Sequence, residues 1–230
     1  MSEEIQNASP KTKNKRKAPI VIGIVAAVLV VAGAGFWVWH EQPSFCSAIC
    51  HTPMDAYGKT YDGSQDFQGN KLDATEASSM LAYQHANLAG TTCMGCHVPT
   101  LSEQVGEGMA WLSGDYYITG TNANGDALIE ARSLSDLTEA RGVAKTEFCQ
   151  NDTCHADTPD RESLIAKTEY LGTYNPHLMR HGEVDCGMCH KGHSQSVNVC
   201  TECHASAPVP DGWLDMASAQ EKGVIPTVNK

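Results

Sequence analysis

Residues 177–204 read HLMRHGEVDCGMCHKGHSQSVNVCTECH, and this stretch decides the fold class of the chain. It contains two Cys-x-x-Cys-His motifs, at residues 186–190 and 200–204. In such a motif the two thiols add to the two vinyl groups of a haem, and the adjacent histidine supplies one axial nitrogen to the iron. The stretch therefore predicts two covalently attached haems that lie close together along the chain.

The same pattern uses every cysteine in the sequence. The ten cysteines form five pairs, and a histidine directly follows each pair. The five sites are Cys46, Cys50 and His51; Cys93, Cys96 and His97; Cys149, Cys154 and His155; Cys186, Cys189 and His190; and Cys200, Cys203 and His204. Five such coincidences have a chance of roughly one in ten million, so we expect five covalently bound haem c groups.

Two of the five sites have a longer loop between their cysteines. Three residues separate Cys46 from Cys50, and four separate Cys149 from Cys154. A longer loop can bulge without moving the histidine, so both sites are kept. A disulfide framework gives no reason for a histidine after each pair. Structural zinc would combine two pairs per metal and leave one pair unmatched.

Composition predicts how such a chain folds. Beyond residue 39 about 38 residues are available per haem, and aromatic residues make up only 7% of the chain. So little large apolar side chain does not build a large ordinary core, but packed macrocycles can replace one. We predict a mainly α protein with much irregular structure and little sheet, with residues 40–204 forming a pentahaem cytochrome c domain around stacked haems. Residues 125–142 favour an amphipathic helix, and residues 205–230 a C-terminal tail that is loosely packed from residue 208.

The N-terminal region indicates a membrane anchor. Residues 19–39, PIVIGIVAAVLVVAGAGFWVW, carry no charge and span about 31 Å as a helix, enough for a bilayer core. Residues 1–18 carry five basic residues against two acidic ones, which predicts a cytoplasmic tail, with everything after the span on the extracytoplasmic side. We expect a single-pass protein of the cytoplasmic membrane that contacts lipid through this helix. A cleaved signal peptide is the alternative, but the apolar run is longer than most signal cores.

The net charge of the chain beyond residue 18 limits the classes of binding partner. After residues 1–18, 11 basic and 25 acidic residues remain, a net charge of −14. This disfavours nucleic acid and anionic lipid as partners. The sequence also leaves a homo-oligomer open.

Further histidines can complete the coordination of iron. Five histidines remain outside the attachment motifs, and Met54 follows His51 by three residues; the histidines are His40, His85, His177, His181 and His193. A surface histidine is the ordinary alternative for each. Because most of these histidines cluster beside attachment sites, we expect His85, His177, His181, His193 and Met54 to be distal ligands. Six-coordinate haems relay electrons but do not readily bind a small substrate, so the supply of ligands favours an electron carrier over a reductase.

The position of the first attachment site in the sequence suggests which molecule donates electrons. Cys46 lies seven residues beyond Trp39, so its haem is at most about 25 Å from the end of the span. A lipid-soluble quinol is the donor available there, and its oxidation releases protons that a nearby carboxylate could accept. Asp115 and Asp55 are the candidates; for Asp55 a solvated acidic residue is the simpler reading.

Three motifs resemble the NapC/NirT family of membrane-bound multihaem quinol dehydrogenases, which includes the small subunit of cytochrome c nitrite reductase. They are CSAICHTPM (46–54), HANLAGTTCMGCHVP (85–99) and HLMRHGEVDCGMCHKGH (177–193), within a resemblance over residues 15–195. The family implies menaquinol oxidation beside a Met-ligated haem and a chain of bis-His haems leading to an extracytoplasmic terminal reductase subunit. Carried over, Met54 is the methionine ligand, His85 and His193 are distal histidines, and Asp115 is the carboxylate. His177 fits the spacing before the fourth site.

The chain also departs from that family. Met54 follows its histidine by three residues rather than two, and no lysine occurs between Lys71 and Lys145, where a quinol-site lysine is expected. The fifth site lies beyond the four-haem core, and either His181 or His177 could ligate it. Two alternatives stay open: a multihaem reductase with an open haem acting on nitrite or a similar small oxidant, and an electron conduit without quinol contact.

Overall fold

The computed structural model describes residues 17–49, 51–129 and 134–226. Contacts between residues divide the chain into two units, residues 1–40 and residues 41–230. The described part of the first unit consists almost entirely of helix α1 (Ala18–His40), which has a mean hydropathy of 2.6 over its most apolar stretch. Its 23 residues extend about 34 Å. The helix is therefore apolar enough and long enough to span a membrane, as the sequence predicts.

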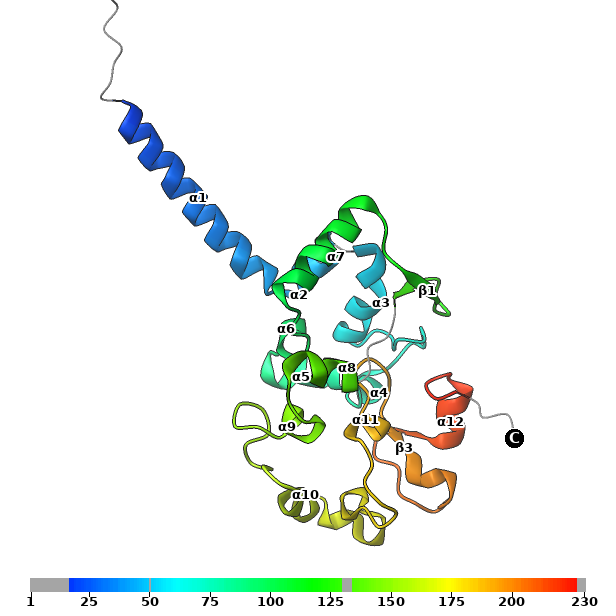
Figure 1. Ribbon diagram of the computed structural model, residues 1–230. Helices are drawn as coiled ribbons and strands as arrows, with labels where there is room; N and C mark the ends of the chain where they lie inside the picture. Colours follow the sequence, from blue (N-terminus) through cyan, green and yellow to red (C-terminus); the bar gives the residue numbers. More distant parts are fainter. Residues whose placement is uncertain (1–16, 50, 130–133, 227–230) are drawn as a thin grey trace, which may run out of the picture. The chain divides into compact units, whose positions relative to one another are not determined.

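The second unit consists of short helices joined by long connections (Figure 1). The described α-helices are α2 (Pro43–Ile49), α3 (His51–Asp62), α4 (Ala74–Ala77), α5 (Leu81–Ala89), α6 (Cys93–Cys96), α7 (Leu101–Ser113), α8 (Leu134–Arg141), α9 (Lys145–Cys149), α10 (Arg161–Lys167), α11 (Cys186–Cys189) and α12 (Met216–Glu221). Three 3₁₀ segments accompany them, η1 (Glu169–Tyr174), η2 (Pro176–Leu178) and η3 (Val199–Glu202). The predicted mainly α, irregular fold class is confirmed.

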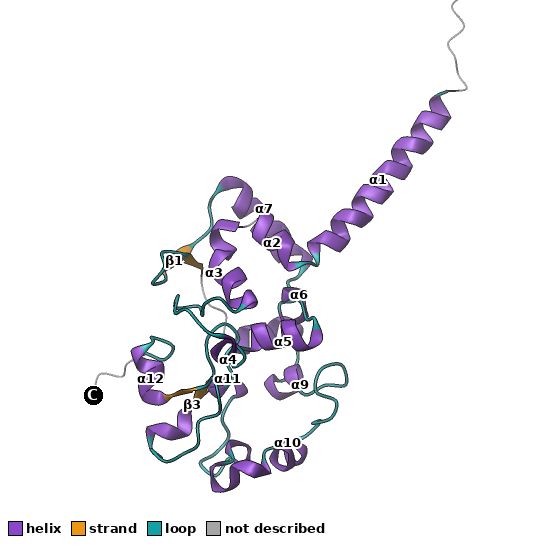
Figure 2. Ribbon diagram, turned by 180° about the vertical axis from the view of Figure 1, so that it is seen from behind, coloured by secondary structure: helices purple, strands orange, loops and turns teal. Residues whose placement is uncertain are grey.

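Sheet is confined to two small pairs of strands among the described residues (Figure 2). Strand β1 (Ile118–Thr121) pairs antiparallel with β2 (Ala127–Ile129), and β3 (Val197–Asn198) pairs parallel with β4 (Leu214–Asp215). The helix predicted over 125–142 is therefore wrong for its first part. A strand occupies Ala127–Ile129, residues 130–133 lie outside the described residues, and α8 begins at Leu134.

Helix α3 is the scaffold of the first half of the second unit. It contacts α2, α5 and β2. Its Lys59 forms an ion pair with Asp126 in the β1–β2 turn, and the Asp126 carboxylate also accepts hydrogen bonds from Gln65 at 2.7 Å and Asn122 at 3.2 Å. These bonds hold the hairpin against the helix.

The apolar core is small and belongs to the C-terminal part. Its buried members are Val197, Leu214, Met216 and Ala219. The loose packing predicted beyond residue 208 is therefore wrong as far as residue 226, because strand β4 and helix α12 supply three of these four residues. Gly212 enables this packing: its φ is +78°, and a Cβ there would lie 2.1 Å from a backbone oxygen of Thr75.

Candidate haem-binding sites

Four of the five attachment motifs are described at both cysteines and the histidine, and three of them form one tight turn. Helices α6 and α11 run from the first cysteine to the second, and η3 contains Cys200. A backbone N–H closes each turn, with His97, His190 and His204 donating to the first cysteine at 2.8–2.9 Å. Because residues i and i+3 share one face of a helix, the turn directs both thiols of a site to the same side.

The longer third loop is absorbed by an asparagine. Helix α9 ends at Cys149, and the side-chain oxygen of Asn151 accepts backbone N–H bonds from Thr153 at 3.0 Å and Cys154 at 3.1 Å. This Asx-type turn takes up the two extra residues. At the first site Cys46 lies in α2, whereas Cys50 and the side chain of His51 lie outside the described residues.

The cysteines described are thiols rather than disulfides. Burial, followed by the charge of Cys46, raises the pKa of Cys93 to about 11; burial and Cys186 do the same for Cys149. Among the described residues no group of three or more His, Cys, Asp or Glu side chains is arranged to hold a metal ion.

Three attachment histidines face a second histidine at nearly the same spacing. The ring centroids are 6.1 Å apart for His97 and His193, 6.0 Å for His155 and His85, and 6.0 Å for His204 and His181. Metal–imidazole bonds are about 2 Å long, so two histidines on opposite sides of one iron have ring centroids about 6 Å apart. The spacing in each pair fits an iron between the two rings.

The fourth site has the same composition but a less regular geometry. His177 and His190 line one pocket together with Cys189, Tyr174 and Trp213. The Trp213 ring packs edge-on against His190 at 5.0 Å. Burial lowers the pKa of His190 to about 4, with smaller contributions from His177 and His155. The imidazole is thus neutral at pH 7, the form that binds iron.

Hydrogen bonds fix the orientation of three of the distal rings. His85 Nδ1 donates to the Leu81 carbonyl at 2.7 Å. The Thr60 hydroxyl donates to the Tyr57 carbonyl at 2.8 Å, so it must accept from His193 Nδ1–H at 2.7 Å.

The His177 ring is held in the same way. The Thr168 hydroxyl has one proton to donate, and two acceptors lie within reach of it: the Leu164 carbonyl at 2.6 Å and the Asn175 side-chain oxygen at 3.0 Å. It therefore accepts from His177 Nδ1 at 3.0 Å. In all three histidines the proton is on Nδ1, which leaves the Nε2 lone pair available to a metal.

The attachment sites follow one another in space as they do in sequence. The pKa of Cys93 is raised by burial and then by Cys46, and that of Cys149 by burial, Cys186 and Cys96. Burial and Cys200 raise the pKa of Cys189. Each site thus lies within electrostatic reach of the next.

The other predicted site residues are less clearly placed. Met54 is half-buried in α3, and Asp115 is exposed directly after α7. Sequence reasoning missed Thr60 and Thr168, because a single threonine far from a motif gives no signal. Pairing them with His193 and His177 required the folded structure.

Two cysteines and a histidine at each of the four fully described motifs, with a second histidine facing three of the attachment histidines, define the class of multihaem c-type cytochromes. Residues 135–205 match the cytochrome c3 family. The chain is 49% identical over 229 residues to "Cytochrome c-type protein Cgr1" of Eggerthella lenta, which covers 96% of this chain and 98% of that protein. The chain therefore belongs to the c-type cytochromes, electron-transfer proteins with covalently bound haem c. No solved structure matches it significantly.

Proposed function

We propose that the protein is a membrane-anchored pentahaem cytochrome that oxidises menaquinol and relays the electrons to an extracytoplasmic terminal reductase. The observation that carries the proposal is the position of the first attachment site. Cys46 follows the last residue of the apolar helix α1 by only six residues. The remaining attachment sites then lead away from that one in succession. This arrangement suits a donor dissolved in the membrane.

Each iron would be held by the histidine of its own motif, and four would have a second histidine as ligand. These pairs are His97 with His193, His155 with His85, His190 with His177, and His204 with His181. The pairing supports the resemblance to the NapC/NirT family, and it gives His181 rather than His177 to the fifth site. When bound, the haems supply reversible one-electron transfer.

The protein's own residues have three tasks in this scheme. The cysteines would fix each haem covalently, and the paired histidines would hold four of the irons from both sides, which would leave small oxidants no place to bind there. Burial lowers the pKa of His177, His190 and His193, which favours the neutral form of the imidazole that binds iron. This disfavours an open-haem reductase at four sites; at the first, Met54 is the proposed second ligand.

Asp115 is the proposed proton acceptor for quinol oxidation. Its carboxylate is exposed, at the end of a helix that lies beside the first attachment site, where Glu107 adds to the effect of burial in raising the pKa of Cys46. A carboxylate with access to water can take the proton released with each electron and pass it to solvent.

Rapid reduction by a menaquinol analogue tests the proposal. Full-length protein in nanodiscs is mixed with the analogue, and the haem absorbance is followed by stopped flow. We expect Asp115→Asn to slow reduction by about a hundredfold, as for loss of a general base. The matched variant Asp211→Asn, near the fifth site, should reduce at the normal rate. Reduction by dithionite but not by the quinol contradicts the proposed donor.

The acceptor side is tested separately. Affinity purification of the full-length cytochrome from detergent-solubilised membranes should recover a reductase that reoxidises the quinol-reduced protein. If the reduced cytochrome instead reacts directly with nitrite, with shifts typical of ligand binding to an open iron, the open-haem alternative replaces the relay.

A further inference from the structure

Helix α7 carries an apolar stripe that the described residues leave exposed. Leu101, Val105, Met109 and Leu112 are 75%, 59%, 60% and 71% exposed. At 3.6 residues per turn these positions lie within about 80° of one another around the helix axis. Gly108 lies in the same sector, and a Cβ built on it would meet nothing within 4 Å. The stripe is therefore continuous and open.

The polarity of α7 is the reverse of that of an ordinary surface helix. Its partly buried residues are Glu103, Gln104 and Ala110, and of these Glu103 and Ala110 lie on the opposite side from the stripe. A helix on a globular protein normally turns its apolar side inward and its polar side to water. A helix with polar residues inward and an apolar stripe outward indicates that something apolar covers the stripe.

Both ends of helix α7 are capped, so the stripe residues keep their positions around the helix axis. Thr100 and Glu103 form a reciprocal capping box at its start, and Gly114 ends it in the left-handed region with φ +71°. The stripe is thus a fixed face of a regular helix rather than a loop that could turn inward.

The attached group at the first site does not explain the stripe. Glu107 is the residue of α7 whose charge reaches the Cys46 thiol. Its position is about 120–160° around the helix axis from each of the four stripe residues. The first attachment site therefore lies on the inner side of α7, away from the stripe.

The covalent chain ties α7 to the apolar helix. Helix α2 begins at Pro43, three residues after α1 ends at His40, so its start is at most about 11 Å from the end of that helix. Since α7 lies beside Cys46 of α2, it cannot be far from the membrane surface if α1 spans the bilayer.

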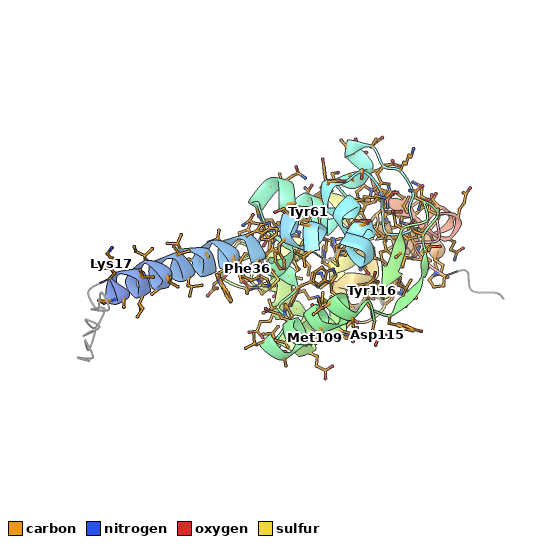
Figure 3. All side chains as sticks on the ribbon, turned by 90° about the horizontal axis from the view of Figure 1, so that it is seen from above. Lys17, Phe36, Tyr61, Met109, Asp115 and Tyr116 are labelled. Carbon is orange, nitrogen blue, oxygen red and sulfur yellow. The ribbon has the colours of Figure 1, made fainter. Side chains whose placement is uncertain are left out.

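We propose that α7 lies in the outer membrane–water interface, with its stripe buried among the acyl chains of zwitterionic phospholipid. This inference rests on the proposed function, because it requires α1 to remain as an anchor. Trp111 and Tyr117, 39% and 78% exposed, are of the type that favours this depth. Met109 and Asp115 lie along one edge of the unit (Figure 3). The same helix would thus hold Asp115 at the level of quinol headgroups.

The interaction can be measured by photolabelling. Full-length cytochrome is placed in phosphatidylcholine nanodiscs that contain a phosphatidylcholine with a diazirine on its acyl chain, and labelled peptides are identified by mass spectrometry after illumination. We expect adducts on residues 101–113 and on residues 18–40, and none on α10 as an internal control. The double variant Val105→Glu/Met109→Glu should lower labelling of α7 by about tenfold, because carboxylates oppose burial in lipid.

The controls separate the two proposals. Val105→Leu/Met109→Leu keeps the stripe apolar and should be labelled like the natural chain, and unchanged haem spectra show that each variant is folded. Labelling of α1 without α7 overturns the interfacial helix and leaves the anchor standing. Absence of label on both helices removes the anchor, and the proposed function with it. Equal labelling of α7 in the Glu and Leu variants also overturns the inference, as does a stripe that is shielded from lipid by a copurifying protein.

Discussion

At the residue scale, histidine pairs with equal spacing differ in the angle between their rings. The planes are 82° apart for His85 and His155, but 29° apart for His181 and His204. Nearly perpendicular imidazoles on a low-spin ferric iron give a strongly anisotropic paramagnetic resonance signal, whereas nearly parallel ones give a rhombic signal. The two proposed pairs of ligands should therefore be distinguishable in one protein.

Single variants should remove these signals separately. We expect His85→Ala to abolish a strongly anisotropic signal and His181→Ala to abolish a rhombic one, each with a new high-spin signal from the iron that has lost its distal ligand. Paramagnetic resonance of the oxidised protein is the measurement. Loss of the same signal in both variants, or no high-spin signal in either, contradicts the proposed pairing.

Thr60 is expected to tune the iron bound by His193. Acceptance of the Nδ1 proton makes the imidazole a stronger donor, which favours ferric iron. Thr60→Val removes that acceptor, so the midpoint potential of one haem should rise by about 40 mV, equivalent to ~1 kcal/mol for a one-electron couple. Thr60→Ser keeps the hydroxyl and is the control. A spectroscopic redox titration in which both variants behave alike would reduce Thr60 to a packing role.

The attachment residues can be predicted from the sequence because covalent attachment requires cysteine and histidine at fixed local spacing. The partner of each histidine was not predictable in the same way. His193 follows the fourth motif in sequence but faces His97 of the second, and His85 precedes the second motif but faces His155 of the third. Such contacts depend on tertiary structure, which local spacing does not encode.

At the scale of elements, the β1–β2 hairpin depends on one carboxylate. Hydrogen bonds from Lys59, Gln65 and Asn122 lower the pKa of Asp126, with burial opposing them. The folded-state pKa therefore lies below the unfolded value near 3.9. The resulting stabilisation is present above about pH 4 and is lost as the pH falls through the lower folded-state value.

Removing the charge should flatten this dependence. We expect Asp126→Asn to lower the free energy of unfolding by about 1 kcal/mol at pH 7 and to lose less stability than the natural chain between pH 5 and pH 3. Urea unfolding at several pH values, followed by far-ultraviolet circular dichroism, provides the test. Parallel pH profiles for the two proteins would show that another carboxylate is responsible.

The errors in predicting elements have physical causes. Ala127–Ile129 has an apolar pattern that suits either a helix or a strand, and pairing with β1 decides for the strand. The C-terminal segment was predicted to be loose because of its Pro and Gly residues. Gly212 instead makes the close turn that brings Leu214 onto the core.

At the scale of the whole molecule, the number of covalently bound haems per chain tests whether all five motifs are attachment sites. We expect the intact mass of the mature protein to exceed that of the chain by five haem groups. Cys46→Ser/Cys50→Ser should lower the count to four, and Cys149→Ser/Cys154→Ser should do the same despite the longer loop. High-resolution mass spectrometry of each purified protein measures this directly. If the natural protein carries four haems and one of these double variants also carries four, the site altered in that variant does not bind haem.

The succession of attachment sites has a consequence for how the protein is made. A chain exported from its N-terminus delivers His85, His177 and His181 before the motifs they face, but His193 follows His97 by 96 residues. The second site would thus be complete only when most of the chain has emerged. Until then its iron would have one open face on the outer side of the membrane. A chain stalled or truncated before His193 would carry that reactive centre permanently, so the second site would close late in assembly, just before the fifth motif at residues 200–204 emerges.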